Sequence, residues 1–159
     1  MKSMVMMMKI NKIFVLILFV CSLFIFLSCN GNNSCGKKEE VVTYKDGTYE
    51  GRSQDHTADS DGVGSGYSTC TIVIEDNKIV SCEVIMYELD GTIKDENYGS
   101  GYSKDNQIKA QKAIQAASRY ASQLVNTNSV KDVDAISGAT ITYSEFIEAV
   151  NDALSKAKE

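Results

Sequence analysis

The segment from Tyr67 to Tyr87 decides the fold, and it reads YSTCTIVIEDNKIVSCEVIMY. Apolar residues fall on even-numbered positions in both halves, a period of two that is typical of strands with one buried face. This inward set is Cys70, Ile72, Ile74, Val80, Cys82, Val84 and Met86. Placing both halves on one face requires a loop of odd length, which Glu75, Asp76 and Asn77 supply, with Asn77 in the left-handed conformation. The segment therefore predicts an antiparallel β-hairpin.

In this register the hairpin places Cys70 directly opposite Cys82 on the inner face. Two readings stay open for the pair. The thiols could form a disulfide in an oxidising compartment, or they could be small apolar core residues, because opposed cysteines on adjacent strands often lack disulfide geometry. The chain has no C-x-x-C pair and one histidine, His56, so no metal site is expected.

The remainder of residues 41–159 predicts two helices after the strands. One is expected from Asn106 to about Val125, and a second after Thr142. Thr142 and Glu145 fit a capping box, in which Thr142 caps the helix and Glu145 bonds back to it. The apolar positions of the first helix are Ile108, Ala113, Ala117, Tyr120, Ala121 and Leu124. Strands followed by helices predict a single α+β domain, with a small antiparallel or mixed sheet covered by helices.

The first 28 residues are typical of an export signal rather than of the domain. Lys2, Lys9 and Lys12 precede an apolar run of 15 residues, 13–27, which is short for a membrane span of roughly 20 residues. Phe26-Leu27-Ser28-Cys29 resembles a bacterial lipobox, and this resemblance implies that Cys29 carries lipid. An uncleaved anchor is the alternative. Residues 29–40 are polar and are expected to be a flexible tether.

The charge of the chain limits its partners. Removal of residues 1–28 takes three of the 16 basic residues and none of the 21 acidic ones, so the formal charge changes from −5 to −8 (13 minus 21). An acidic surface argues against nucleic acid and anionic lipid as partners. Contact with a lipid membrane is therefore expected only through Cys29.

The segment Asp134-Ala135-Ile136-Ser137-Gly138-Ala139-Thr140, called here the Asp134–Thr140 segment, carries the functional argument. It presents a threonine hydroxyl just ahead of the last helix. Small residues let another molecule approach the backbone, and the free N–H groups and dipole of a helix start favour a phosphate. An ordinary surface turn between helices is the alternative reading.

The same segment resembles the flavinylation motif Asp-x-x-[Ser/Thr]-Gly-Ala-[Ser/Thr] of the FMN-binding domain family. The stretch from Asp46 to Gly51 resembles the Gly-x-Tyr-x-Gly opening of these domains, and Gly66 with the hairpin resembles their central hairpin. The resemblance implies that an FMN transferase, using FAD and magnesium, joins FMN to Thr140 through a phosphoester. Ser137, Gly138 and Ala139 would shape the turn and bind the phosphate. Asp134 would be read by the transferase, or would accept an Asx-turn bond.

The function implied by this resemblance is an exported, lipid-anchored electron carrier rather than a complete enzyme. Its expected place is the extracytoplasmic face of the cell envelope, periplasmic or extracellular, with a quinone- or NADH-linked membrane redox partner. Two alternatives are a non-redox surface lipoprotein used for binding or adhesion, and a subunit of a membrane Rnf-type complex. Tyr49, Tyr67 and Tyr98 are candidates to stack on the flavin ring, and His56 is a candidate proton donor.

Overall fold

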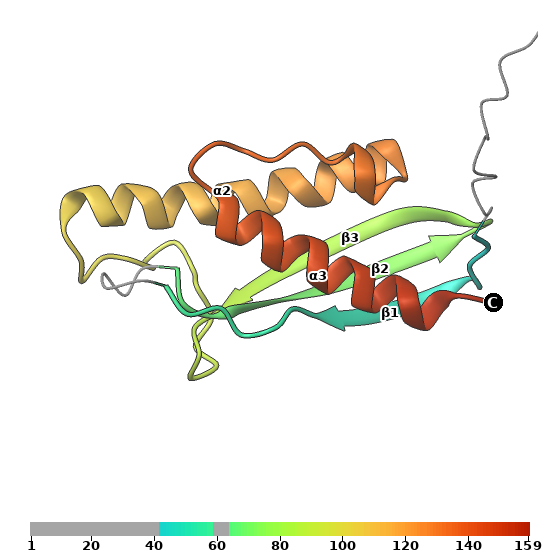
Figure 1. Cartoon of the computed structure of the whole chain (residues 1–159), viewed down its shortest axis with the longest axis horizontal. Coiled ribbons are helices and arrows are strands. Elements are labelled where there is room, and N and C mark those ends of the chain that lie inside the picture. Colours follow the sequence, from blue (N-terminus) through green and yellow to red (C-terminus); the bar gives the residue numbers. More distant parts are fainter. Residues whose placement is uncertain (1–41, 59–63) are drawn as a thin grey trace, which may run out of the picture. The chain divides into compact units, whose positions relative to one another are not determined.

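Three antiparallel strands form one sheet in the order β1-β2-β3, and the helices follow them in the chain (Figure 1). The computed structural model describes residues 42–58 and 64–159. The elements are β1 (Gly47–Arg52), β2 (Tyr67–Glu75), β3 (Lys78–Tyr87), α2 (Lys104–Thr127), the 3-10 helix η1 (Val130–Asp132) and α3 (Thr140–Ala157). The predicted α+β class is confirmed, with a purely antiparallel sheet.

The predicted signal peptide, Cys29 and the tether lie outside the described residues. Within residues 42–58 and 64–159, no helix combines the length and apolar character that a membrane crossing requires.

The hairpin of β2 and β3 turns through two residues rather than the predicted three. Asp76 and Asn77 both have positive φ, 51° and 61°, as a two-residue hairpin turn with twist-matching geometry requires. A bulge in β3 then restores the inward pattern, because the register shifts between Val73 and Ile74. As a result Ile79 is buried, and Val80, predicted to point inward, is 44% exposed.

The bulge also changes the partner of each cysteine. The Cα of Cys82 pairs with Ile72, and Cys70 pairs with Val84, so the prediction that the cysteines are directly opposite is wrong. They are diagonal neighbours on the inner face, where both are free thiols with sulfur atoms 3.4 Å apart. Cys70 belongs to the buried core. The hydrogen bond with Cys82 and burial raise the pKa of the Cys70 thiol.

Both helices cover one face of the sheet, with α3 over β1 and β2 and α2 over β3 (Figure 1). The closest approach is at Gly51 in β1. A Cβ placed there would lie 2.0 Å from the carbonyl oxygen of Ala149 and 2.4 Å from the backbone nitrogen of Ala153. Gly51 therefore allows α3 to rest directly on the strand, and this packing is a structural reason for a glycine in the opening motif.

The helix boundaries differ from the predicted ones at both N-termini. Helix α2 begins after Ser103, whose side chain accepts a hydrogen bond from the backbone of Asn106. Its first turns extend beyond the sheet (Figure 1), and Ile108, predicted on the apolar face, is 59% exposed there. Helix α3 begins at Thr140, so the predicted capping box is wrong. The helix begins directly after Ala139, earlier than predicted, so Thr142 and Glu145 lie inside it, where both are buried.

Candidate functional site

A tyrosine on α2 holds the Asp134–Thr140 segment against the core. The hydroxyl of Tyr120 accepts a hydrogen bond from the backbone N–H of Ile136 at 2.9 Å and donates one to the carbonyl oxygen of Ala139 at 3.3 Å. The ring of Tyr120 is fully buried and packs against Tyr143 and Phe146 of α3. One side chain therefore fixes both ends of the turn that precedes Thr140.

The turn itself spans Ile136 to Ala139. The backbone N–H of Ala139 donates to the carbonyl oxygen of Ile136 at 3.0 Å, and Gly138 occupies the third position with φ of 79°. A turn of type II requires positive φ at this position, which glycine adopts without steric cost. Ser137, at the second position, is exposed.

Thr140 is the first residue of α3, and its side chain is exposed. The N-cap residue is Ala139, which makes no side-chain capping bond. The first N–H groups of a helix have no partner within the helix, so those at Thr140 remain available to an anion, favoured also by the helix dipole. The ammonium of Lys112 lies beside the turn, because a Cβ placed on Gly138 would be 3.0 Å from its Nζ.

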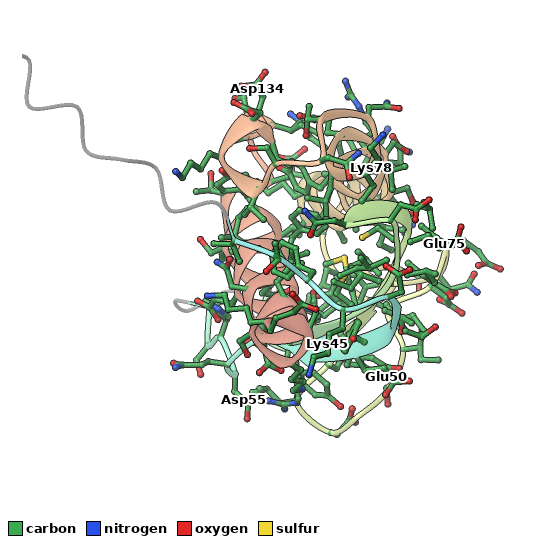
Figure 2. The ribbon with its side chains drawn as sticks, turned by 90° about the vertical axis from the view of Figure 1, so that its right-hand side faces the viewer. Lys45, Glu50, Asp55, Glu75, Lys78 and Asp134 are labelled. Carbon is green, nitrogen blue, oxygen red and sulfur yellow. The ribbon has the colours of Figure 1, made fainter. Side chains whose placement is uncertain are left out.

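Asp134 lies apart from this helix start. Its backbone N–H donates to the side-chain oxygen of Gln123 at 2.7 Å, while its carboxylate is exposed and points outward at one end of the molecule (Figure 2). The carboxylate accepts no hydrogen bond from the residues that the structure describes, so the Asx-turn role considered for Asp134 has no support. An exposed carboxylate is instead accessible to another protein.

A cavity of about 400 Å³ opens beside Thr140. This volume is within the range of about 300–1,000 Å³ that small-molecule sites occupy. Its walls come from Ala58 and Gly64 before β2, from the end of β3 and the loop after it, from α2, and from the first turns of α3. Small and apolar side chains lie there beside charged ones. The lining includes Met86, Lys94, Tyr98, Ala110, Ala113 and Glu145, together with Gly138 to Thr142.

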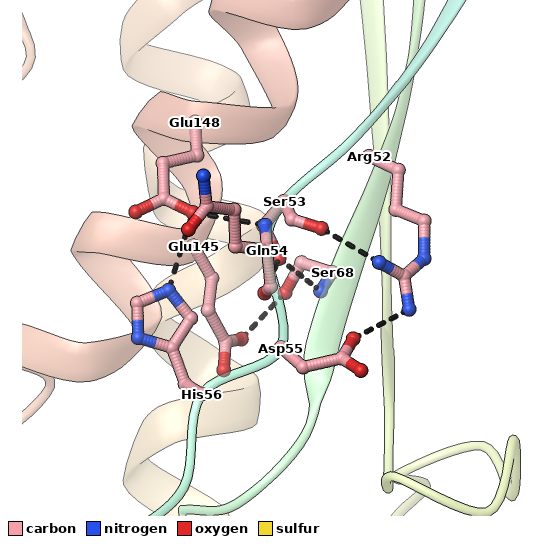
Figure 3. A network of polar contacts seen from close by, with 8 residues as sticks. All are labelled: Arg52, Ser53, Gln54, Asp55, His56, Ser68, Glu145 and Glu148. Carbon is pink, nitrogen blue, oxygen red and sulfur yellow. Dashed lines mark hydrogen bonds and ion pairs between the residues drawn. The ribbon is translucent and has the colours of Figure 1, made fainter.

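Glu145 is the least expected member of this wall, because a carboxyl group is rarely fully buried. Its side chain is 0% exposed. One oxygen, Oε2, accepts a hydrogen bond from the hydroxyl of Ser68 at 2.7 Å (Figure 3), and the other, Oε1, has no hydrogen-bond partner among the described residues. Burial raises the pKa of Glu145, against the opposing effects of Ser68 and of the nearby positive charge of Lys94.

Lys94 is the second buried charge in the wall, only 5% exposed. Its ammonium lies 5.1 Å from the centre of the Tyr98 ring. A Cβ on Gly66 would be 2.6 Å from Nζ, so the glycine before β2 makes room for this side chain. Burial lowers the pKa of Lys94, while the charges of Glu145 and Glu88 act in the opposite direction.

The sequence reasoning missed both buried charges as site residues. Lys94 lies in a polar loop whose composition gives no sign of burial, and Glu145 was assigned to a helix cap. The available signal for Glu145 was its position between Thr142 and Phe146 on the side of the helix that faces the sheet. Among the described residues, no three His, Cys, Asp or Glu side chains gather as metal ligands would.

The aromatic candidates separate into one that lines the cavity and two that do not. Tyr98 is 7% exposed, lines the cavity, and its hydroxyl accepts a hydrogen bond from the backbone of Gly64 at 3.0 Å. Tyr67 lies on the other face of the sheet, stacked on Tyr87 with ring centres 5.0 Å apart. Tyr49 packs against the core, and its hydroxyl donates to the carbonyl oxygen of Lys45.

His56 also has a structural place. Its Nε2 is 3.2 Å from the carboxylate of Glu148 (Figure 3), and its backbone forms two hydrogen bonds with Gly66. Together these contacts tie the loop after β1 to α3 and to the start of β2. The residues that line the cavity do not include His56.

Comparison with known proteins identifies the group to which this architecture belongs. In fold, the chain is similar to the crystal structure of the CPE2226 protein from Clostridium perfringens, with 22% sequence identity and a TM-score of 0.56, over 72% of this chain and 89% of that one. No functionally curated protein matches the sequence. The sequence profile described as the FMN-binding domain matches residues 41–155, most of the chain. The chain therefore belongs to the FMN-binding domain family.

Proposed function

We propose that this chain is an exported, lipid-anchored flavoprotein that carries FMN on the Thr140 hydroxyl and passes electrons between a membrane donor and an extracytoplasmic partner. Membership of the FMN-binding domain family supports the cofactor. When bound, FMN supplies one- and two-electron redox chemistry, while the protein positions it and tunes its potential.

The observation that carries the attachment site is the position of Thr140. An exposed hydroxyl stands at a helix start that lacks a capping side chain and that borders the cavity. A phosphate esterified to this oxygen would meet the free N–H groups of the first helical turn. The nearby ammonium of Lys112 supports the same site, since most of this chain's charge is negative.

The cavity fits the ring of the cofactor in chemistry as well as in volume. Apolar side chains such as Met86, Ala110 and Ala113, with the ring of Tyr98, suit a flat aromatic group. Polar side chains, including those of Asn106 and Lys109, share the lining with these apolar ones and could orient the cofactor. Thr140, Gly138 and Ala139 would hold the phosphate end, and the walls of the cavity would hold the ring and exclude water from it.

The attachment reaction is a transfer from FAD by a separate FMN transferase. The Thr140 oxygen forms a bond to the FMN phosphorus, the pyrophosphate bond of FAD breaks, and AMP leaves with the bridging oxygen. The hydroxyl proton passes to a base of the transferase or to water. The side-chain carboxylate of Asp134 is exposed and accepts no hydrogen bond from the described residues, so it is available for recognition by that enzyme.

The test of the attachment site is incubation of the purified chain with FMN transferase, FAD and magnesium, followed by intact mass measurement. The wild type should gain the mass of FMN minus one water. Thr140→Ala should gain nothing, while Thr140→Ser, which keeps the hydroxyl, should be modified. Thr142→Ala is the matched control, because Thr142 also borders the cavity but is buried. Unchanged modification of Thr140→Ala would reject the site.

The anchor and location are supported by the sequence before residue 41. Lipidation at Cys29 would leave the domain on a tether outside the cytoplasm, where a covalent bond prevents loss of the cofactor. Globomycin should block processing, and Cys29→Ala should abolish incorporation of a labelled fatty acid. A Cys29→Ala protein that still incorporates the labelled fatty acid would contradict the lipid anchor at this residue.

A further inference from the structure

Two buried charged groups border the cavity, and one of them lacks a hydrogen-bond partner. The Oε1 atom of Glu145 accepts no hydrogen bond from the described residues, whereas the ammonium of Lys94 lies over the Tyr98 ring, 5.1 Å from its centre. Burying a charge is costly unless it is paired and hydrogen-bonded. A native structure that retains both groups, each at most 5% exposed, points to a ligand that completes them.

The two groups are held in place rather than free to move. Ser68, itself fully buried in β2, donates to the second oxygen of Glu145 at 2.7 Å. The Lys94 side chain passes over Gly66, where any Cβ would collide with its ammonium, and its backbone N–H donates to Met86 at 2.9 Å. One acceptor and one donor are therefore presented at fixed positions in the cavity wall.

The pyrimidine edge of a flavin ring has the complementary pattern. It carries an N–H donor, N3–H, between two carbonyl oxygens that accept. A carboxylate oxygen such as Glu145 Oε1 accepts from an N–H, and an ammonium donates to a carbonyl oxygen. The phosphate and sugar of FMN lack this donor between two acceptors, and the apolar side chains of the wall, such as Met86, suit the flat ring better than the phosphate.

We propose that Glu145 and Lys94 form a subsite for the pyrimidine edge of the flavin ring, with Glu145 accepting from N3–H and Lys94 donating to an adjacent carbonyl oxygen. The inference rests on the proposed function, because it assigns contacts to the same cofactor. It makes Lys94 a tuning residue as well. A fixed positive charge beside the ring favours the reduced form, which carries more negative charge.

The test compares riboflavin with 3-methylriboflavin, which lacks the N3–H donor, by fluorescence titration of the full chain before flavin attachment. Riboflavin has no phosphate, so the titration reports on the ring subsite alone. The wild type should bind riboflavin at least tenfold more tightly than the methylated form. Glu145→Leu should lose this preference, and Glu145→Gln should keep it, because an amide oxygen also accepts.

The matched control is Glu148→Leu, one turn further along α3 and outside the cavity lining; it should keep the preference. Lys94→Met should weaken binding of both flavins equally. Circular dichroism establishes that each variant is folded. Equal binding of the two flavins by the wild type, no riboflavin binding at all, or a preference that survives in folded Glu145→Leu would overturn the subsite.

The loaded protein gives a second, independent readout. In Lys94→Met with flavin attached, the equilibrium between reduced and oxidised flavin should shift at least tenfold toward the oxidised form, about 30 mV for a two-electron couple. An unchanged potential would overturn the role of Lys94. A normal mass gain at Thr140 without the N3–H preference would overturn only the subsite, whereas the preference without any mass gain would overturn only the attachment.

Discussion

Replacing Glu145 with glutamine should stabilise the flavin-free protein at neutral pH. The carboxyl group is fully buried, with Ser68 as the sole hydrogen-bond donor to it among the described residues. Glutamine keeps the shape, its amide NH2 can donate to the Ser68 hydroxyl while its oxygen faces the cavity, and it carries no charge. Leaving a buried donor or acceptor unpaired costs about 1–3 kcal/mol, and more when the group is charged. Glutamine still leaves one amide atom unpaired but removes the charge, so we expect Glu145→Gln to raise the free energy of unfolding by about 1 kcal/mol at pH 7.5.

The pH dependence gives the sign of this effect a separate test. Burial raises the pKa of Glu145 above its ordinary value of 4.5. At pH values between 4.5 and the pKa in the folded state, Glu145 therefore binds more protons in the folded protein than in the unfolded one. The contribution of Glu145 to stability is highest below pH 4.5 and is lost as pH rises through the folded-state pKa. Glutamine lacks this loss. The advantage of Glu145→Gln should be small at pH 4.5 and should grow toward pH 7.5.

The assay is urea unfolding of both flavin-free proteins at several pH values, followed by circular dichroism. The difference between variant and wild type removes the contributions of other carboxylates, such as Asp152, whose pKa is lowered by hydrogen bonds from Lys156 and the backbone of Arg52. A variant that is less stable than the wild type at pH 7.5, or a difference that does not change with pH, would refute the reasoning about Glu145.

Three further predictions concern packing and the support of the site. Gly51→Ala should lower the free energy of unfolding, measured in urea, by about 3 kcal/mol, because overpacking against α3 typically costs 1–3 kcal/mol or more. Gly101→Ala is the control, because Gly101 has open space around it, and it should leave the free energy of unfolding nearly unchanged. Tyr120→Phe should destabilise the protein by about 1–3 kcal/mol and slow flavin attachment in the transferase assay, because Ile136 and Ala139 lose their hydrogen-bond partner. The control Tyr49→Phe should leave the attachment rate unchanged. Attachment to Tyr120→Phe at the wild-type rate would contradict the role of the Tyr120 hydroxyl. Mass spectrometry after denaturing alkylation should find Cys70 and Cys82 both alkylated, and a mass showing the two joined would contradict the free-thiol state.

The sequence predicted the parts of the fold that depend on local pattern. Alternation at even positions in β2 identified Cys70, Ile72 and Ile74 as the buried face, because the pleat of a strand fixes which side chains share a face. It failed at the turn, where Asp76 and Asn77 with a bulge at Val80 satisfy the same inward pattern as a three-residue loop. The spacing of the apolar positions alone cannot distinguish a three-residue loop from a two-residue turn followed by a bulge.

The position of Thr140 beside a helix start was predictable from the sequence, and the cavity next to it was not. Thr140 lies in a motif that is local in the chain. Lys94 and Glu145 come together from a loop and a helix about fifty residues apart, through room made by Gly66 and the bond from Ser68. Such burial depends on tertiary packing and leaves no periodic signal. The same is true of Tyr120, which looked like an ordinary core residue and proves to hold the turn before Thr140.

The most direct test of the central claim is peptide mapping of the protein isolated from its own host. Trypsin cleavage after Lys131 and Lys156 releases residues 132–156, which include Thr140, Thr142 and Ser137. This peptide should be yellow and fluorescent, and its fragment spectrum should place FMN on Thr140. Recovery of the unmodified peptide from cells with an active FMN transferase, or FMN on another residue, would contradict the account.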